Sequence, residues 1–180
     1  MDLTYTVKKS AKRKKLTITV ERDREVIVHA PASTSDEKIA QVPAILAEKG
    51  IDLWLLFARE SHTLHDPCFD LVVGANVTWP SAFMLSANGD RIAIVGSLDK
   101  ANQQAHGHYA EITGYVGGVS DDLRKTLAQL DPKRIAINYS LDDTMSDGLT
   151  HGMYLLLQKA LEGTPYGARL EPAAGIIAAL

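Results

Sequence analysis

The apolar run GIDLWLLF at residues 50–57 is the strongest structural signal in this chain of 180 residues. It contains one charged residue, Asp52, and it follows a segment with apolar residues at helical spacing between Ile39 and Leu46. A short apolar run that follows a helix is typical of a strand buried on both faces of a sheet. The run therefore predicts an α/β fold in which residues 51–57 form a central strand.

The helix before this strand is bounded by start and stop signals. Residues 33–35 offer an N-cap, and Asp36 and Glu37 would complement the helix dipole in the first turn. Gly50 would end the helix as a C-cap glycine. Pro43 predicts either a kink in this helix or a later helix start, and both alternatives stay open.

The residues after the central strand predict further strands and helices. Asn88-Gly89 between two apolar segments predicts a β-hairpin. Strands are expected over residues 83–85, 92–95, 112–116 and 134–138, and helices over 120–130, 149–161 and from 172 onward. This order predicts a mixed α/β sheet with flanking helices on its faces.

The first 32 residues have a different pattern, in which apolar and polar residues alternate. Such alternation predicts short strands with one buried face, arranged here as an N-terminal β-meander. The basic run Lys8 to Lys15 would connect the first two strands. A basic patch can bind phosphates, but this run lacks interleaved aromatic residues, so a solvated hairpin tip is the preferred interpretation.

Composition limits the classes of function. The net charge is −3 and charged residues make up 23% of the chain, which argues against a nucleic-acid-binding protein. No apolar run approaches the roughly 20 residues of a membrane span. A single cysteine, Cys68, excludes an internal disulfide and is expected to be a buried, inert thiol. These features predict a cytoplasmic protein with no membrane contact.

The loop after the central strand is the candidate site, because α/β proteins place ligand loops there. It carries Arg59, Glu60, His62, His65 and Asp66. A metal site is one alternative, but no His-Glu-x-x-His motif exists and a catalytic zinc normally needs three protein ligands. The preferred alternatives are a polar loop that meets a substrate or partner subunit, and a plain solvated loop. We assign no catalytic residue and no metal ligand.

Three other polar groups have simpler interpretations. His106 and His108 are expected in an exposed turn. Asp142, Asp143 and Asp147 resemble a cation cluster, but helix capping is the preferred role. His151 is expected to be a packed helix side chain.

From about Ile45 to Leu180 the sequence resembles the N-terminal domain of the pita-bread metallopeptidases, which include Xaa-Pro aminopeptidase (aminopeptidase P), prolidase and creatinase. The resemblance covers about three quarters of the chain. Its motifs lie at residues 50–61, 71–74, 134–140, 147–154 and 176–180. It implies a ribonuclease-H-like creatinase N-terminal domain over residues 33–180. The family's two divalent metals are expected only in the catalytic pita-bread domain, which is absent here.

Residues 3 to 40 resemble something else, the leading β-segment of small bacterial zincin-type metal-dependent hydrolases. The matching motifs lie at residues 12–20, 26–31 and 34–39. The His-Glu-x-x-His helix of that family is missing as well. Residues 1–32 are therefore predicted to be a separate segment, and whether the chain is a natural fusion or a fragment stays open.

The main resemblance implies a non-catalytic domain that serves oligomerisation and active-site walling. Arg59, Glu60, His62, His65 and Asp66 would then reach a partner's site. We expect a homodimer, with a catalytic domain or partner subunit as the other binding partner, and apolar surface exposed by the terminal helix from Ile176. The alternative is a small independent metal-dependent hydrolase that uses the histidines of the loop.

Overall fold

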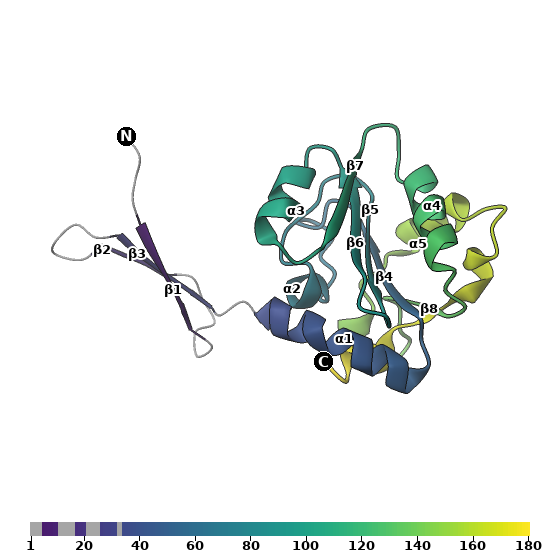
Figure 1. The fold of residues 1–180 in the computed structure, drawn as a ribbon, viewed down its shortest axis with the longest axis horizontal. Helices are drawn as coiled ribbons and strands as arrows, with labels where there is room; N and C mark the ends of the chain where they lie inside the picture. The colour runs from purple at the N-terminus through teal and green to yellow at the C-terminus, as the bar shows by residue number, and fades with distance from the viewer. Residues whose placement is uncertain (1–4, 11–16, 21–25, 32–33) are drawn as a thin grey trace.

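The computed structural model describes residues 5–10, 17–20, 26–31 and 34–180, which contain a six-stranded and a three-stranded sheet (Figure 1). The strands of the larger sheet are β4 (Leu53–Ala58), β5 (Ser81–Ser86), β6 (Arg91–Gly96), β7 (Glu111–Tyr115), β8 (Ile135–Ile137) and β9 (Leu170–Pro172). The helices are α1 (Thr34–Lys49), α2 (Phe69–Val72), α3 (Lys100–His106), α4 (Ser120–Leu130), α5 (His151–Ala160), α6 (Ala174–Ile177) and the 3₁₀ turns η1 (Thr144–Ser146) and η2 (Tyr166–Arg169). The mixed α/β sheet with flanking helices is confirmed.

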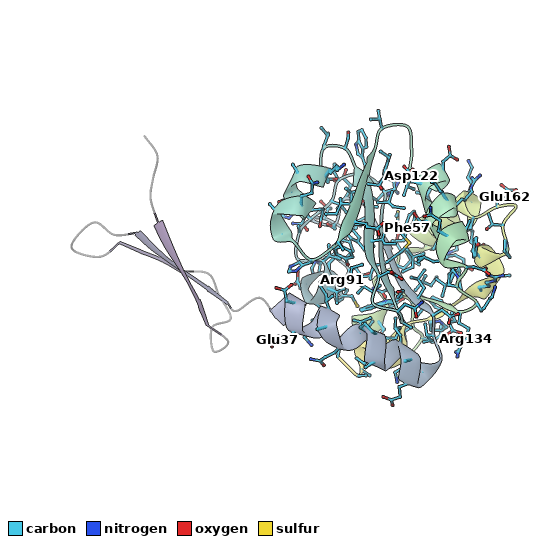
Figure 2. All side chains as sticks on the ribbon, in the orientation of Figure 1. Glu37, Phe57, Arg91, Asp122, Arg134 and Glu162 are labelled. Atoms are coloured by element: carbon cyan, nitrogen blue, oxygen red, sulfur yellow. The ribbon has the colours of Figure 1, made fainter. Side chains whose placement is uncertain are left out.

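Strand β4 lies inside the sheet and is buried along its whole length. Its alternate residues Trp54, Leu56 and Ala58 pack with α1, α2 and α6. Leu53, Leu55 and Phe57 pack with α4 and α5 on the other face. Figure 2 shows side chains filling the space on both sides of the sheet, with Phe57 near its centre. The apolar run at residues 50–57 is thus a strand with two buried faces, as predicted.

The direction of the strands in the larger sheet determines at which edge of the sheet the loops that follow them lie. Strand order is β7-β6-β5-β4-β8-β9, and β5 alone is antiparallel to its neighbours. The other five strands of this sheet therefore end at one edge, which we call the carboxyl edge. The loop that joins β7 to α4 leaves this edge at the top of Figure 1. Ligand sites of α/β sheets lie at such an edge.

Helix α1 runs without interruption through Pro43. Pro43 therefore does not mark a helix start. The helix ends at Gly50, which has φ +62° and donates its N–H to the Ala47 carbonyl at 3.2 Å. The N–H of Ile51 bonds to the Leu46 carbonyl at 2.9 Å, so two terminal carbonyls are satisfied. The predicted C-cap glycine is confirmed.

The hairpin at Asn88-Gly89 and the helix over residues 120–130 are also confirmed. Gly89 has φ +92°, and the Ser86 N–H bonds to the Asp90 carbonyl at 3.0 Å. Helices α2 and α3 and strand β9 were not predicted, because each is at most seven residues long and carries too few turns to produce a periodic pattern. No helix among the described residues is long and apolar enough to cross a membrane.

The N-terminal strands are β1 (Tyr5–Ser10), β2 (Thr17–Val20) and β3 (Val26–Pro31). Their order is β1-β3-β2, with β1 parallel to β3, so the predicted meander is wrong in its pairing. The six-residue β3 pairs with all six residues of β1 and with four of β2. A central β2 would offer only its four residues to each neighbour, which leaves backbone groups of the longer strands unpaired.

This order also changes the interpretation of the basic run. Lys8 and Lys9 lie inside β1, which is not paired with β2, so the run is not the tip of a hairpin. The rest of the run, residues 11–15, lies outside the described residues. The boundary predicted between residues 32 and 33 lies outside them too, and it stays a prediction.

The terminal helix packs on the body of the same chain rather than exposing apolar surface. Ile176 is fully buried and Ile177 is 9% exposed, and both belong to the core beneath α1. The Lys38 ammonium donates to the Leu180 carbonyl at 2.5 Å. The expectation that Ile176 and Ile177 expose apolar surface is therefore wrong, because both are buried in the core of the same chain.

Candidate functional site

The loop after β4 is fixed at its base to the segment that precedes β5. The N–H groups of Glu60 and Ser61 bond to the carbonyls of Thr78 and Val77 at 3.1 and 3.0 Å. The buried Ser61 hydroxyl accepts the Val77 N–H at 2.9 Å. Glu60 holds a left-handed backbone with φ 45°. These contacts place the following residues at the carboxyl edge.

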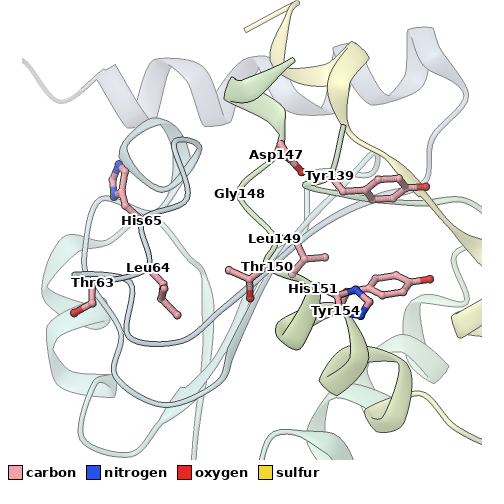
Figure 3. A pocket seen from close by; sticks show the side chains of 10 residues that line it. All are labelled: Thr63, Leu64, His65, Tyr139, Asp147, Gly148, Leu149, Thr150, His151 and Tyr154. Atoms are coloured by element: carbon pink, nitrogen blue, oxygen red, sulfur yellow. The ribbon is translucent and has the colours of Figure 1, made fainter. Parts of the chain in front are cut away.

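A pocket of about 760 Å³ lies between this loop and the N-terminus of α5, and we call it the main pocket (Figure 3). The Thr150 side chain caps α5 by accepting the Met153 N–H at 3.3 Å. In Figure 3 residues 63–65 lie on one side, and the rings of Tyr139 and Tyr154 lie on the other. The lining residues are Thr63, Leu64, His65, Tyr139, Asp147, Gly148, Leu149, Thr150, His151 and Tyr154.

The five predicted site residues are not all brought together. His65 lines the main pocket, and its Nε2 lies 3.6 Å from the Asp70 carboxylate. Arg59 and Glu60 line a neighbouring hollow with Trp79 and Pro80. His62 is exposed to solvent. Asp66 is buried, so it cannot itself reach a partner. The role of these residues in walling a partner's site stays a prediction.

Asp66 belongs to a buried chain of hydrogen bonds that lies beneath the main pocket. The Trp54 indole N–H donates to Asn138 Oδ1 at 2.7 Å. The Asn138 amide donates to Asp66 Oδ2 at 2.8 Å, and the Cys68 N–H donates to Asp66 Oδ1 at 2.8 Å. These hydrogen bonds link β4, the end of β8 and the loop. The indole N–H can only donate, so it fixes which atom of Asn138 accepts and which one donates.

The environment of Asp66 perturbs its acidity and restricts its neighbour. Burial raises the pKa of the Asp66 carboxyl, and hydrogen bonds from Asn138 and Cys68 oppose that rise. The carboxyl lies against the backbone of Gly148, where a Cβ atom would overlap the Asp66 carboxyl group. Gly148 lines the main pocket, so the buried Asp66 helps to set the pocket's shape.

Cys68 is an inert thiol, as predicted. It is fully buried, and burial together with the nearby Asp66 carboxylate raises its pKa. The thiol donates to the Met145 carbonyl at 3.3 Å. A thiol whose ionisation is suppressed is a poor nucleophile.

The other polar groups depart in part from their predicted roles. His108 is buried rather than exposed, and its Nδ1 lies 2.8 Å from Asp36 Oδ1. His151 is exposed at the main pocket rather than packed, because it lies on the side of α5 opposite the buried Met153 and Leu157. Asp143 does cap η1, but Asp147 does not cap α5, whose N-cap is Thr150.

Sequence reasoning missed the part that Tyr139, Thr150 and Tyr154 play in the pocket. These residues lie about 75 positions or more from the loop at residues 63–65 with which they form it. The usable signal was that all three fall in or beside two motifs of the family resemblance, at residues 134–140 and 147–154. No group of three His, Cys, Asp or Glu side chains that could hold a metal occurs within the described parts of the chain.

Comparison with known proteins gives structural likeness without sequence likeness. No protein-family profile matches the sequence. No curated protein matches it either. Solved structures do match the fold with TM-scores of 0.53 to 0.58.

Three of these structures represent the set. The creatinase/prolidase N-terminal domain of an X-Pro dipeptidase from Streptococcus pyogenes has a TM-score of 0.58 at 14% identity, over 81% of this chain and 100% of that one. The N-terminal domain of the cytoplasmic peptidase PepQ from Mycobacterium tuberculosis has a TM-score of 0.56 at 16% identity, over 81% of this chain and 98% of that one. The Xaa-Pro dipeptidase from Bacillus anthracis has a TM-score of 0.55 at 19% identity, over 78% of this chain but only 34% of that one.

The chain therefore spans about a third of the whole dipeptidase and nearly all of the isolated domains. None of these three proteins is a zincin-type hydrolase, and the predicted resemblance of residues 3–40 to that class is not supported. The fold shared with these structures is that of the N-terminal domain of creatinase and prolidase.

Proposed function

We propose that this chain acts as the non-catalytic N-terminal domain of an Xaa-Pro peptidase-like protein, and that it docks a partner at its carboxyl edge. The partner is a catalytic domain or a second copy of the chain, and docking would place the loop at residues 59–65 at the wall of the partner's site. The names of the similar structures supply the peptidase part of this proposal.

The observation that carries the docking role is a continuous row of hollows along the carboxyl edge. A hollow beside Tyr115 and Val116 shares Trp79 and Pro80 with the hollow of Arg59 and Glu60. The latter shares Thr63 and Leu64 with the main pocket. A continuous hollowed surface is what a partner of matching shape would fill.

Exposed apolar side chains stand along the same edge. Leu98 is 75% exposed after β6, and Val116 is 78% exposed after β7. The two are close, because Gly96 pairs with Tyr115 and the Ser97 N–H bonds to the Tyr115 carbonyl at 2.9 Å. Exposed apolar patches commonly mark interfaces. A two-fold dimer is the commonest closed assembly, so we infer a homodimer through this edge.

The dimer is tested by light scattering across a concentration series. We expect a mass near twice 19.6 kDa at high concentration, reduced toward 19.6 kDa by Val116→Asp because a charge would replace apolar contact. Leu141→Asp is the matched control, since Leu141 is 96% exposed and lines none of the three hollows. A mass of one chain at every concentration contradicts the dimer. Ile176→Asp is unsuitable here, since Ile176 lies in the core.

A second prediction concerns catalysis. With the two metals of the reaction expected in a separate catalytic domain, the purified chain plus manganese, cobalt or zinc should release no proline from Xaa-Pro dipeptides. Free proline is measured against a blank that contains metal alone. Turnover above the blank that is lost in His62→Ala or His65→Ala would instead support the independent hydrolase.

We also propose a cytoplasmic location for the protein. The structural neighbour from Mycobacterium tuberculosis is described as a cytoplasmic peptidase, and the single cysteine suits a reducing compartment. We propose no nucleic-acid role, since the chain carries a net charge of −3.

A further inference from the structure

The ionisable side chains that line the main pocket include one carboxylate and the two histidines His65 and His151. Asp147 is the one carboxylate among the described residues that line the pocket, and none of these residues is a lysine or arginine. Asp147 is exposed, and its Oδ1 accepts a long hydrogen bond of 3.4 Å from the Ser140 N–H. The carboxylate can therefore accept further donors from a bound molecule.

The pocket also has an aromatic wall. Tyr139 and Tyr154 are half-buried, and Figure 3 shows their rings one above the other, extending in the same direction. Burial raises the pKa of Tyr139, and the nearby Tyr154 and Glu171 add to the rise. Arg134 pairs with Glu171 at 2.8 Å, so that carboxylate is already engaged, whereas Asp147 lines the pocket itself.

The remaining lining combines the apolar Leu64 and Leu149 with the polar Thr63, His65, Thr150 and His151. Leu64 is 42% exposed and Leu149 is 8% exposed, and both line the pocket. Gly148 rests on Asp66, which the buried chain through Asn138 and Trp54 holds in place. The volume of about 760 Å³ lies in the range of sites that hold small molecules, about 300–1,000 Å³.

We propose that the main pocket binds a small organic ammonium compound with an apolar or aromatic body. The Asp147 carboxylate would pair with the ammonium group, the faces of Tyr139 and Tyr154 would attract it through cation–π contact, and Leu64 and Leu149 would contact the body. An organic anion would be repelled by the Asp147 carboxylate, so we expect it to bind less tightly. This inference goes beyond the docking role, and it concerns a pocket that also belongs to the row of hollows proposed as the docking surface.

The test uses three probes that share one ring and differ in charge: benzylamine, benzyl alcohol and benzoate. Each is titrated into the full chain at pH 8, above the range in which histidine changes charge. Binding is followed by NMR through the backbone amides of residues 147–151. We expect benzylamine to bind roughly fivefold more tightly than benzyl alcohol, from one exposed ion pair plus cation–π contact, and benzoate to bind least.

Variants identify the groups responsible. Asp147→Asn should bring the affinity for benzylamine down to that for benzyl alcohol. Asp142→Asn is the matched control, because Asp142 is exposed in the preceding loop and does not line the pocket, and it should leave the affinity unchanged. The proposal is overturned if benzoate binds as well as benzylamine, if benzylamine causes no saturable shift, or if Asp147→Asn leaves its affinity unaltered.

Discussion

Gly148→Ala is expected to lower the free energy of unfolding by about 3 kcal/mol or more, the upper range for overpacking a filled site. The Cβ of alanine would overlap the Asp66 carboxyl group. That group cannot move away freely, because its two oxygens accept hydrogen bonds from Cys68 and Asn138. The methyl group therefore either breaks these hydrogen bonds or displaces the backbone between η1 and α5. Urea denaturation followed by fluorescence measures the loss.

Gly152→Ala is the matched control for this substitution. Gly152 lies in the first turn of α5, four positions away, and a Cβ there meets nothing within 4 Å. Its effect should stay within about 0.5 kcal/mol, as at most exposed positions. Asp66→Ala removes the carboxyl group that the new Cβ would overlap. The double variant Asp66→Ala/Gly148→Ala should therefore lose less free energy of unfolding than the sum of the losses in the two single variants. Strict additivity would contradict the proposed contact.

Local patterns predicted five of the six strands of the larger sheet, all except the three-residue β9, because the signals of these five strands lie within their own residues. The burial of β4 follows from the fact that all six of its residues are apolar. The end of α1 follows from Gly50, because glycine adopts φ +62° at a lower energetic cost than other residues. Pairing is different, since alternation identifies β1, β2 and β3 but not which strand is central. The order β1-β3-β2 depends on relative strand length, which the alternating pattern of residues 5–31 does not reveal.

The site was harder to predict than the fold because it is assembled from distant segments. Asp66 follows two exposed histidines, and its local pattern indicates a solvated loop. Its partner Asn138 is 72 residues away, and Trp54 is another 84 residues from Asn138. Asp66 is therefore part of the core, although its neighbours in the sequence indicate an exposed loop. His151 is the opposite case, because the helical pattern around it predicts a packed side chain and the structure places it at the pocket. Residue type alone could not separate these two cases.

Asp66→Asn is expected to lower the free energy of unfolding by about 2 kcal/mol at pH 7, although the shape of the side chain hardly changes. The hydrogen-bond chain from Trp54 fixes the Asn138 oxygen toward the indole and its amide nitrogen toward Asp66. The oxygen of the substituted side chain must still accept the Cys68 N–H, so its new amide nitrogen would face the Asn138 amide nitrogen. Two donors then oppose each other in a buried site, and turning Asn138 would only move the conflict to the indole.

The pH dependence of this difference provides a further test. The pKa of Asp66 is raised in the folded state, so between the ordinary value of 3.8 and the raised value the folded chain binds more protons than the unfolded chain. The wild-type free energy of unfolding therefore falls as pH rises through that window. The amide introduced by Asp66→Asn does not titrate. The difference in free energy of unfolding between wild type and variant should therefore narrow from acid to neutral pH. Asp70→Asn, at an exposed position four residues along, is the control. A gap that widens with pH would show that the folded state favours the charged carboxylate, contrary to the dominant effect of burial.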